Sequence, residues 1–332
     1  MSTYRKLVAT KRTTDFRQAA EIVKEELPEP GPGEVVVRNK YAGVNATDVN
    51  ITAGRYDPSA TPPFPLGAEA TGTIEAVGAD VERLSEGDAV VTNTLGGGYR
   101  EYQCVAARNC LNVPQPTPEV LSIVVSGLTA SIALNEVGRM KSDETVLVTA
   151  AAGGTGQYAV QLAEREGNHV IGTCSTPEKV ELLEKLGCDR PINYREEDVS
   201  TVLADEYPDG VDLVYEGVGG ALFDTCVDAL AVHGRLLAIG YVSEYVDGPE
   251  RVDQPRIYTK LLPKSASIRG FFLPHFAEHF GAHIRHLLEL QHRDELYIAI
   301  DERTFHGLES IPDAVEYLHS GQSRGKVVVQ LH

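Results

Sequence analysis

The sequence predicts an α/β protein that combines a doubly wound parallel sheet with a second, β-rich domain. After residue 146, strand and helix patterns alternate regularly, which is typical of a parallel sheet covered by helices. The first 125 residues instead contain short valine-rich runs separated by glycine and proline, as in a small antiparallel barrel. The chain has 332 residues, more than one hydrophobic core usually holds, so two domains are expected.

The β-rich part contains four runs that we expect to form strands. They lie at residues 34–39, 72–77, 88–92 and 99–105. The first follows the segment PEPGPG, in which proline and glycine favour a turn. The short, regular spacing of these runs favours antiparallel pairing in one small barrel.

The second part of the chain begins with a helix expected at residues 128–137. Strands are then expected at residues 146–149, 169–173, 211–215 and 235–239, and helices at 177–186, 198–206 and 221–231. Residues 267–273 are expected to add one more strand. The segment 276–290 is amphipathic, and a helix at 311–320 and a strand at 326–331 end the chain. This last unit breaks the alternation, so we expect it to return to the first domain.

A turn of small residues at 150–156 joins the first strand of the second part to a helix. Ala151, Gly153 and Gly156 occupy the spacing G-x-G-x-x-G, with alanine in the first place. Such a turn lets backbone N–H groups and a helix N-terminus approach a pyrophosphate. The motif alone also fits a merely tight turn, but its position inside a strand–helix–strand unit predicts a dinucleotide site.

The end of the next strand indicates which dinucleotide binds. NAD sites usually carry Asp or Glu there, to hold the 2′-hydroxyl of the ribose. This strand ends in the sequence IGTCS without an acid, and Ser175 and Lys179 follow. Neutral and cationic groups suit a 2′-phosphate, so NADP(H) is favoured over NAD(H). The alternative for Lys179 is a solvated helix residue.

Composition excludes several classes of protein. A net charge of −18 argues against nucleic-acid or anionic-membrane binding, which need a basic face. We find no signal-peptide pattern and no apolar run of membrane-spanning length. The five cysteines form no C-x-x-C pair, which favours a reduced, cytoplasmic protein. They are Cys104, Cys110, Cys174, Cys188 and Cys226.

The sequence gives little support for a metal site or for a catalytic nucleophile. Four histidines share one expected helix, at spacings that put several on adjacent turns: His275, His279, His283 and His286. We interpret them as solvated side chains and predict no metal site. No G-x-S-x-G elbow is present, and Cys174 is expected to be a small packing residue beside the cofactor.

Three stretches carry a resemblance to a known family: GVNATDVNITAGRY (43–56), AAAGGTGQ (150–157) and CSTPEKVELLEKLGCDRPINY (174–194). With them, the chain resembles the medium-chain dehydrogenase/reductase family, in its zinc-free quinone oxidoreductase branch and there the prostaglandin reductases. The resemblance covers most of the chain. It implies a GroES-like, barrel-like catalytic domain from residues 1–125 and 275–332, and a Rossmann domain for NADP from residues 126–274.

The resemblance also implies the site residues. The implied catalytic residues are Asn45, Tyr56 and Tyr245, with Asn45 also beside the nicotinamide ribose. The further cofactor-binding residues are Ser126, Thr129, Ala152, Gly153, Gly154, Thr155, Gly156, Cys174, Ser175, Lys179, Tyr194, Gly217, Val218, Ile239, Gly240, Phe271, Phe272, Leu273 and Ser323. Two positions depart from the pattern, since Asn50 replaces a cleft tyrosine of the branch and Ser323 replaces a frequent asparagine.

The zinc ligands of zinc-dependent relatives are missing. Those relatives carry a cysteine at Asn45 or Ala46 and a histidine at Ala68. The resemblance therefore implies NADPH-dependent reduction of the C=C bond of α,β-unsaturated ketones, such as 15-oxoprostaglandins, without zinc. Alternatives are an NADPH:quinone oxidoreductase and a non-catalytic NADPH-binding sensor or structural protein. The expected partners are a small enone or quinone and a second copy of the chain, joined through residues 267–273.

Overall fold

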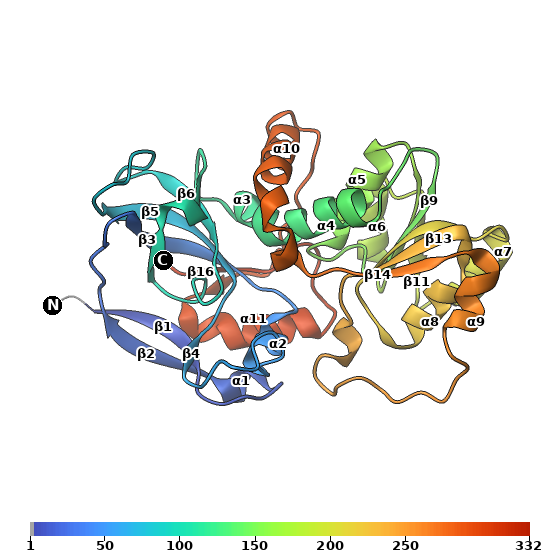
Figure 1. Cartoon of the computed structure of the whole chain (residues 1–332), viewed down its shortest axis with the longest axis horizontal. Coiled ribbons are helices and arrows are strands. Elements are labelled where there is room, and N and C mark those ends of the chain that lie inside the picture. The colour runs from blue at the N-terminus through green and yellow to red at the C-terminus, as the bar shows by residue number, and fades with distance from the viewer. Residues whose placement is uncertain (1–2) are drawn as a thin grey trace. The chain divides into compact units, whose positions relative to one another are not determined.

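The computed structural model describes residues 3–332 and divides them into two compact units. The antiparallel unit holds residues 3–125 together with Ala299–His332, and the parallel unit holds Ser126–Ile298 (Figure 1). The predicted fold class, a doubly wound parallel sheet plus a β-rich domain, is confirmed.

The antiparallel unit contains two sheets. A three-stranded sheet has the order β2-β1-β4, from β1 (Thr3–Ala9), β2 (Ala20–Glu26) and β4 (Phe64–Pro65). The larger sheet has the order β15-β16-β3-β5-β6-β8, and β7 pairs with β3. Its strands are β3 (Glu34–Gly43), β5 (Glu69–Val77), β6 (Ala89–Asn93), β7 (Tyr102–Ala106), β8 (Cys110–Asn112), β15 (Phe305–His306) and β16 (Val328–Gln330). This unit also contains the α-helices α1 (Phe16–Ala19), α2 (Asp48–Thr52) and α11 (Ile311–His319).

The register of this larger sheet brings distant segments together. Val328 of β16 pairs with Gly43 of β3, and Ala42 of β3 pairs with Ala70 of β5. The C-terminal end of the chain therefore lies beside the segment that follows β3 and beside the first residue of β5.

The parallel unit has a six-stranded parallel sheet in the order β11-β10-β9-β12-β13-β14. Its strands are β9 (Thr145–Val148), β10 (His169–Cys174), β11 (Arg190–Asn193), β12 (Val211–Glu216), β13 (Leu230–Ala238) and β14 (Ser267–Gly270). The order reverses between β9 and β12. In such sheets, ligands bind beyond the carboxyl ends of the strands at this point of reversal.

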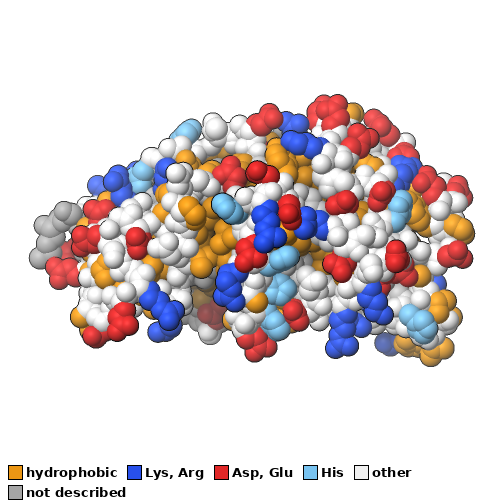
Figure 2. Space-filling model, turned by 90° about the horizontal axis from the view of Figure 1, so that it is seen from above, with side chains coloured by type: hydrophobic (Ala, Val, Ile, Leu, Met, Phe, Trp, Pro, Cys, Tyr) orange, Lys and Arg blue, Asp and Glu red, His pale blue; other side chains and the backbone are white. Residues whose placement is uncertain are grey.

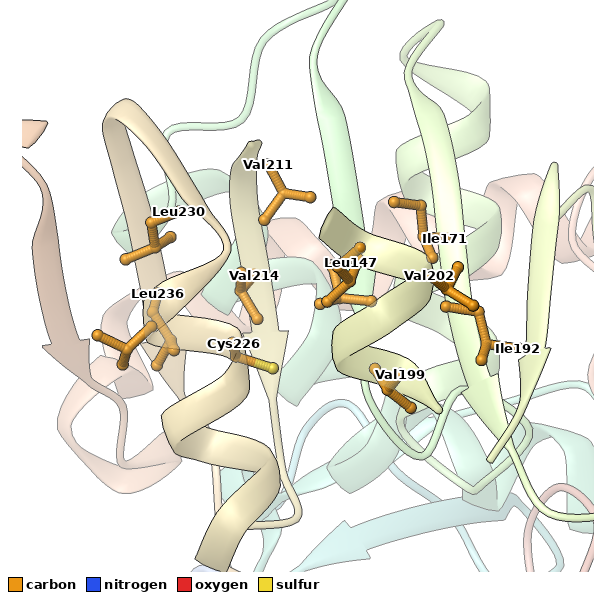
Figure 3. Packing of buried hydrophobic residues seen from close by; sticks show 12 residues of the cluster. Leu147, Ile171, Ile192, Val199, Val202, Val211, Val214, Cys226, Leu230 and Leu236 are labelled. Atoms are coloured by element: carbon orange, nitrogen blue, oxygen red, sulfur yellow. The ribbon is translucent and has the colours of Figure 1, made fainter. Parts of the chain in front are cut away.

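Helices α5 (Gly156–Arg165), α6 (Pro177–Lys185), α7 (Val199–Glu206) and α8 (Gly220–Asp228) pack against the parallel sheet. The same unit also contains α9 (Tyr258–Leu261) and α10 (Phe280–His292). On one face, Val199 and Val202 of α7 and Cys226 of α8 pack with the buried strand residues Leu147 and Val214 (Figure 3). The apolar strands and the apolar helix faces thus form one core.

A long helix runs from Pro118 to Val137 and contains two π-helical turns, at Ile123–Gly127 and Ala133–Val137. The remaining α-helical parts are α3 (Pro118–Ser122) and α4 (Leu128–Ile132). The expectation that no apolar run reaches membrane-spanning length is wrong by length and composition, because an 18-residue window of this 20-residue helix has a mean hydropathy of 1.7. Since 72% of the window is buried, the helix resembles the core helix of a folded domain.

The chain returns to the antiparallel unit at Ala299, rather than at the expected residue 275. The reason is the packing of α10, whose Leu287 and Leu290 are buried. A methyl group on Gly127 would lie 3.0 Å from Leu287, so α10 packs closely against the long helix within the parallel unit.

Candidate active site

The glycine turn lies at the carboxyl end of β9, at the reversal of the parallel sheet. Ala151 N–H bonds the carbonyl of Thr173 at the end of β10. A Cβ on Gly156 would lie 2.5 Å from the Ala150 carbonyl oxygen, so only glycine lets α5 begin this close to the turn. The segment between Ala151 and Gly156 includes Gly153, Gly154 and Thr155, which directly precede the N-terminus of α5. This geometry provides the helix N-terminus that an anionic pyrophosphate needs.

Ser175, Lys179 and Tyr194 come together at the ends of β10 and β11. Thr176 caps α6, and its side chain accepts a bond from the backbone N–H of Lys179. Lys179 lies in the first turn of α6, and its buried ammonium donates to the Ser175 hydroxyl at 3.3 Å. The backbone N–H of the exposed Tyr194 bonds the Cys174 carbonyl at 3.0 Å. Ser175 and Lys179 therefore form one cationic, hydroxyl-bearing pair, and the backbone of Tyr194 lies beside it at the end of β11.

Glu216, at the end of β12, is a buried carboxylate that the sequence analysis did not select. Its Oε1 accepts bonds from the backbone N–H groups of Val218 (2.7 Å) and Gly219 (3.0 Å). Thr149 accepts the N–H of Gly217 at 2.9 Å. Burial raises the pKa of Glu216. Together, Glu216 and Thr149 fix the turn that contains the predicted Gly217 and Val218. An acid that ends the apolar strand sequence VDLVYE was the available signal.

The loop after β13 places Tyr245. Ile239 N–H bonds the Glu216 carbonyl at 2.7 Å, so this loop lies beside the 217–219 turn. A Cβ on Gly240 would lie 2.8 Å from the Tyr245 hydroxyl oxygen, so glycine at this position leaves room for the phenol. Tyr245 is buried and packs edge-on against Tyr241. Its hydroxyl therefore lies next to the end of β13.

The remaining predicted residues of the parallel unit occupy two further places. Ser126 and Thr129 are buried on the long helix, in its first π-helical turn and in α4. Phe271 follows β14, bonds the Ala238 carbonyl and stacks on Phe276. Phe272 is partly exposed, and Leu273 begins the 3-10 helix Leu273–His279, labelled η6. Ala152 is buried in the turn after β9.

In the antiparallel unit, Asn45 belongs to a buried polar network. The Lys326 ammonium donates to Asn45 Oδ1 at 2.7 Å and to Glu69 Oε1 at 2.5 Å. The Asn45 amide donates to the same Glu69 oxygen at 2.9 Å. All three side chains are almost fully buried. The Asn45 amide is thus fixed in one orientation by a buried ion pair.

A second carboxylate extends this network. Asp48 Oδ2 accepts the Asn45 backbone N–H at 2.9 Å and the Tyr99 hydroxyl at 2.5 Å. Burial raises the pKa of Asp48 to about 6. Burial, together with the neighbouring Asp48, also holds the pKa of Tyr99 well above its ordinary value. Asp48 therefore fixes the backbone of Asn45, while Lys326 and Glu69 fix its side chain.

Tyr56 lies on the loop that follows α2 and is 37% exposed. The amide of the buried Asn50 donates to the Tyr56 hydroxyl at 3.3 Å, and Arg55 donates to Asn50 Oδ1 at 2.7 Å. Asn50 thus takes a structural role toward Tyr56, in the place where the resemblance implied a second tyrosine. Ser323 is partly buried and lies three residues before Lys326.

The sequence matches two known domain families. Residues 31–115 match the alcohol dehydrogenase GroES-like domain, and residues 154–289 match the zinc-binding dehydrogenase domain. Prostaglandin reductase-3 of Mus musculus is 47% identical over 339 residues, which cover 99% of this chain and 90% of that protein. The chain belongs to the medium-chain dehydrogenase/reductase family. The resemblance expected from the motifs is thereby confirmed, including the narrower one to the prostaglandin reductases.

Other similar proteins include quinone oxidoreductases and solved structures. A probable quinone oxidoreductase of Leishmania amazonensis is 44% identical over 336 residues, covering 99% of this chain and 98% of that protein. A mycobacterial protein solved in complex with NADPH superposes with a TM-score of 0.85 at 31% identity, over 99% of this chain and 100% of that one. A Pseudomonas syringae quinone oxidoreductase also gives a TM-score of 0.85, at 28% identity and with the same coverage.

The residues of this family member do not fit the catalytic zinc of its zinc-dependent relatives. Asn45, Ala46 and Ala68 occupy the ligand positions, and none offers a thiolate or an imidazole. Glu69, the remaining carboxylate, is already bound by the Lys326 ammonium. A buried cationic side chain thus neutralises this carboxylate.

Lys326, Asp48 and Glu216 were not predicted from the sequence. Lys326 and Asn45 are 281 residues apart, so no local pattern joins them. Asp48 and Glu69 were visible only as acids inside otherwise apolar or small-residue segments, TDVNI and GAEAT. A buried acid needs a partner, whereas an exposed one does not. An acid inside an apolar segment was therefore the available sequence signal for a buried charged network.

Proposed function

We propose that this protein is an NADPH-dependent reductase of the C=C bond of α,β-unsaturated ketones. One observation carries the proposal: Lys326 binds Glu69 and Asn45 where zinc-dependent relatives hold their metal ligands. Without a Lewis acid at this place, alcohol oxidation loses its electrophile. An enone needs only hydrogen-bond donors for its carbonyl oxygen, and tyrosine and amide groups supply those.

NADP(H) is the proposed cofactor, held by the parallel unit. The tight turn at Gly153–Gly156 and the N-terminus of α5 would hold its pyrophosphate. Ser175, Lys179 and Tyr194 would hold the 2′-phosphate, since a cation and hydroxyl groups match its charge. Bound there, the reduced nicotinamide supplies the hydride that reaches the β-carbon of the substrate.

The chain's own residues would stabilise the charge that grows on the carbonyl oxygen as the enolate forms. Electrostatic stabilisation of such a charge is usually the largest catalytic contribution. Tyr56 and Tyr245 are the proposed donors, and Asn45 would orient a ribose hydroxyl as a third. Because Lys326 and Glu69 fix the Asn45 amide, this orientation needs no reorganisation during the reaction. The proton on the α-carbon would come from solvent.

The test is a comparison of NADPH consumption across acceptors. A long-chain enone, a 15-keto lipid and 1,2-naphthoquinone would be compared at matched concentrations, with the reduced product identified by mass spectrometry. We expect the highest kcat/KM with the enones, a saturated ketone as product, and a strong preference for NADPH over NADH. Higher kcat/KM with the quinone would favour the alternative that the Leishmania and Pseudomonas relatives suggest. Tight NADPH binding without turnover on any acceptor would favour a non-catalytic sensor or structural protein.

Tyr56→Phe tests the proposed donor directly. Loss of one donor to an oxyanion costs about 10²–10³ in rate, so kcat on an enone should fall strongly while NADPH affinity stays unchanged. Tyr41→Phe, a half-buried tyrosine on β3 of the same unit, is the matched control. An unchanged kcat/KM in Tyr56→Phe would remove this residue from the mechanism.

We also propose that the protein is a cytoplasmic homodimer. β14 is an edge strand of the parallel sheet, and a second copy of the chain would extend the sheet there into a homodimer. A monomeric mass in light scattering would exclude this dimer. All five cysteines are free, in keeping with a reduced cytoplasmic location.

A further inference from the structure

A cluster of two histidines and one carboxylate lies in the parallel unit, on the long helix and on the η6–α10 segment. Glu136 belongs to the second π-helical turn of the long helix, and His279 and His283 lie one helical turn apart where η6 passes into α10. Their ligand atoms all lie within 4.8 Å of one another. Figure 2 shows histidine side chains gathered on this face, over the part of the molecule where α10 lies.

The distances in this cluster match those between ligands of one metal ion. Glu136 Oε1 lies 3.2 Å from His283 Nε2 and 3.6 Å from His279 Nδ1. Metal–ligand bonds of about 2.0–2.2 Å in a tetrahedron put neighbouring ligand atoms about 3.3–3.6 Å apart. The two separations from Glu136 therefore match a tetrahedral site, and the third pair of ligand atoms lies within 4.8 Å, which leaves one corner for water.

The second nitrogen of each imidazole also has a partner. His283 Nδ1 lies 2.7 Å from the hydroxyl of the buried Ser131, and His279 Nε2 lies 3.4 Å from Glu278 Oε1. Metal-binding histidines almost always have such a partner, which fixes the tautomer and the ring orientation. In both rings the nitrogen that faces Glu136 is thereby left to act as the ligand.

An ion pair between Glu136 and a protonated histidine explains this arrangement less well. Such a pair needs one imidazole, whereas here two converge on the same carboxylate oxygen. Glu136 is 38% exposed, and an ion pair that reaches solvent in this way contributes little and does not hold two rings in a fixed orientation. Ser131 and Glu136, moreover, come from the long helix, 147 to 152 residues before their partner His283.

We propose that Glu136, His279 and His283 bind a divalent transition-metal ion of the Zn²⁺ class, which ties α10 to the long helix. Two imidazoles and a carboxylate select such ions over Mg²⁺ and Ca²⁺, which prefer oxygen ligands. The site is separate from the place where zinc-dependent relatives hold their catalytic metal, and it does not depend on the proposed reductase activity. It differs from the sequence-based expectation that these histidines are solvated.

The test uses the full chain, freed of metal by a chelator and then dialysed. Titration calorimetry with ZnCl₂ should give one saturable site per chain, with a rise in Tm, and MgCl₂ should give neither. Co²⁺ in the same site should show the strong visible absorption of tetrahedral coordination. Ser131→Ala should weaken Zn²⁺ binding by about 10–100-fold, because Ser131 acts through His283.

Variants separate this site from unspecific binding to surface histidines. Glu136→Gln and the double variant His279→Ala/His283→Ala should lose the saturable site and the Co²⁺ spectrum. His286→Ala, an exposed histidine on the same helix outside the cluster, should keep both. Unchanged NADPH binding and circular dichroism would show that each variant folds. Equal Zn²⁺ binding by the wild type and the double variant, or no saturable binding by the wild type, would overturn the proposal.

Discussion

The two units hold their buried charged groups in different ways. In the antiparallel unit, Lys326, Glu69 and Asp48 lie in one network around Asn45, assembled from distant parts of the chain. In the parallel unit, Lys179 and Glu216 bind groups close to them in sequence, four residues away for Ser175 and two for Val218. The network of the antiparallel unit therefore depends on tertiary pairing, whereas Lys179 and Glu216 in the parallel unit bind neighbouring turn residues, with Thr149 as one distant partner of Glu216.

This difference predicts that the same kind of change has unequal effects in the two units. Removing a charge from the network of the antiparallel unit should act mainly on stability, because another buried charge is left alone. Removing a charge or a glycine from the parallel unit should act mainly on nucleotide binding. The following variants test this comparison, from the largest expected effect to the smallest.

Lys326→Met should have the largest effect. It leaves Glu69 buried without its cation, and breaking a buried pair in this way costs about 3–5 kcal/mol of unfolding free energy. Denaturant unfolding followed by fluorescence measures this loss. The double variant Lys326→Met/Glu69→Gln removes both charges and should recover much of it. Equal stability of the single and double variants would show that the pair is not coupled.

Lys179→Ala should change cofactor choice with little effect on stability. A hydrogen bond to a charged group is worth about 1.5–3 kcal/mol, so the Kd for NADPH should rise about tenfold or more while the Kd for NADH stays unchanged. Fluorescence titration with both nucleotides measures this. Lys141→Ala, an exposed lysine of the same unit, is the control. An equal loss of NADH binding would contradict a 2′-phosphate contact.

Gly156→Ala tests the turn itself. Its new Cβ would lie 2.5 Å from the Ala150 carbonyl oxygen and 2.7 Å from the Ala151 Cα, so the turn has to shift. We expect about tenfold weaker binding of both NADPH and NADH, about 1.4 kcal/mol. Gly281→Ala, at a helical glycine where the nearest other atom is 3.5 Å away, should leave both affinities unchanged. Normal nucleotide binding by Gly156→Ala would place the pyrophosphate elsewhere.

Asp48 predicts a smaller, pH-dependent effect in the antiparallel unit. Its pKa is raised from 3.8 to about 6, so the folded state binds this proton more tightly than the unfolded chain does. The resulting stabilisation is fully present below the unfolded pKa and is lost as the pH rises through 6. Between pH 7 and pH 5, the wild type should therefore gain about 1 kcal/mol relative to Asp48→Asn. If the unfolding free energies of the two proteins change with pH by the same amount, the raised pKa of Asp48 is contradicted.

Much of the parallel unit could be predicted from sequence because its signals are local. The strand–turn–helix at 146–163 and the Thr176 cap before Lys179 each lie within one short stretch of chain. Strand β11 was missed because its four residues RPIN include a proline, which is tolerated at a sheet edge but weakens a strand pattern. Segment 275–298 was assigned to the wrong unit because amphipathicity shows that a helix packs, but not against which partner.

The sequence by itself determined the alternation of strands and helices, the pyrophosphate turn and the absence of an acid after β10, since each follows from neighbouring residues. Only the tertiary structure decided that Lys326 binds Glu69 and Asn45, and that Glu136 meets His279 and His283. The physical reason is register. The pairing of β16 with β3 and of β3 with β5, and the packing of α10 on the long helix, bring together side chains that no local pattern connects.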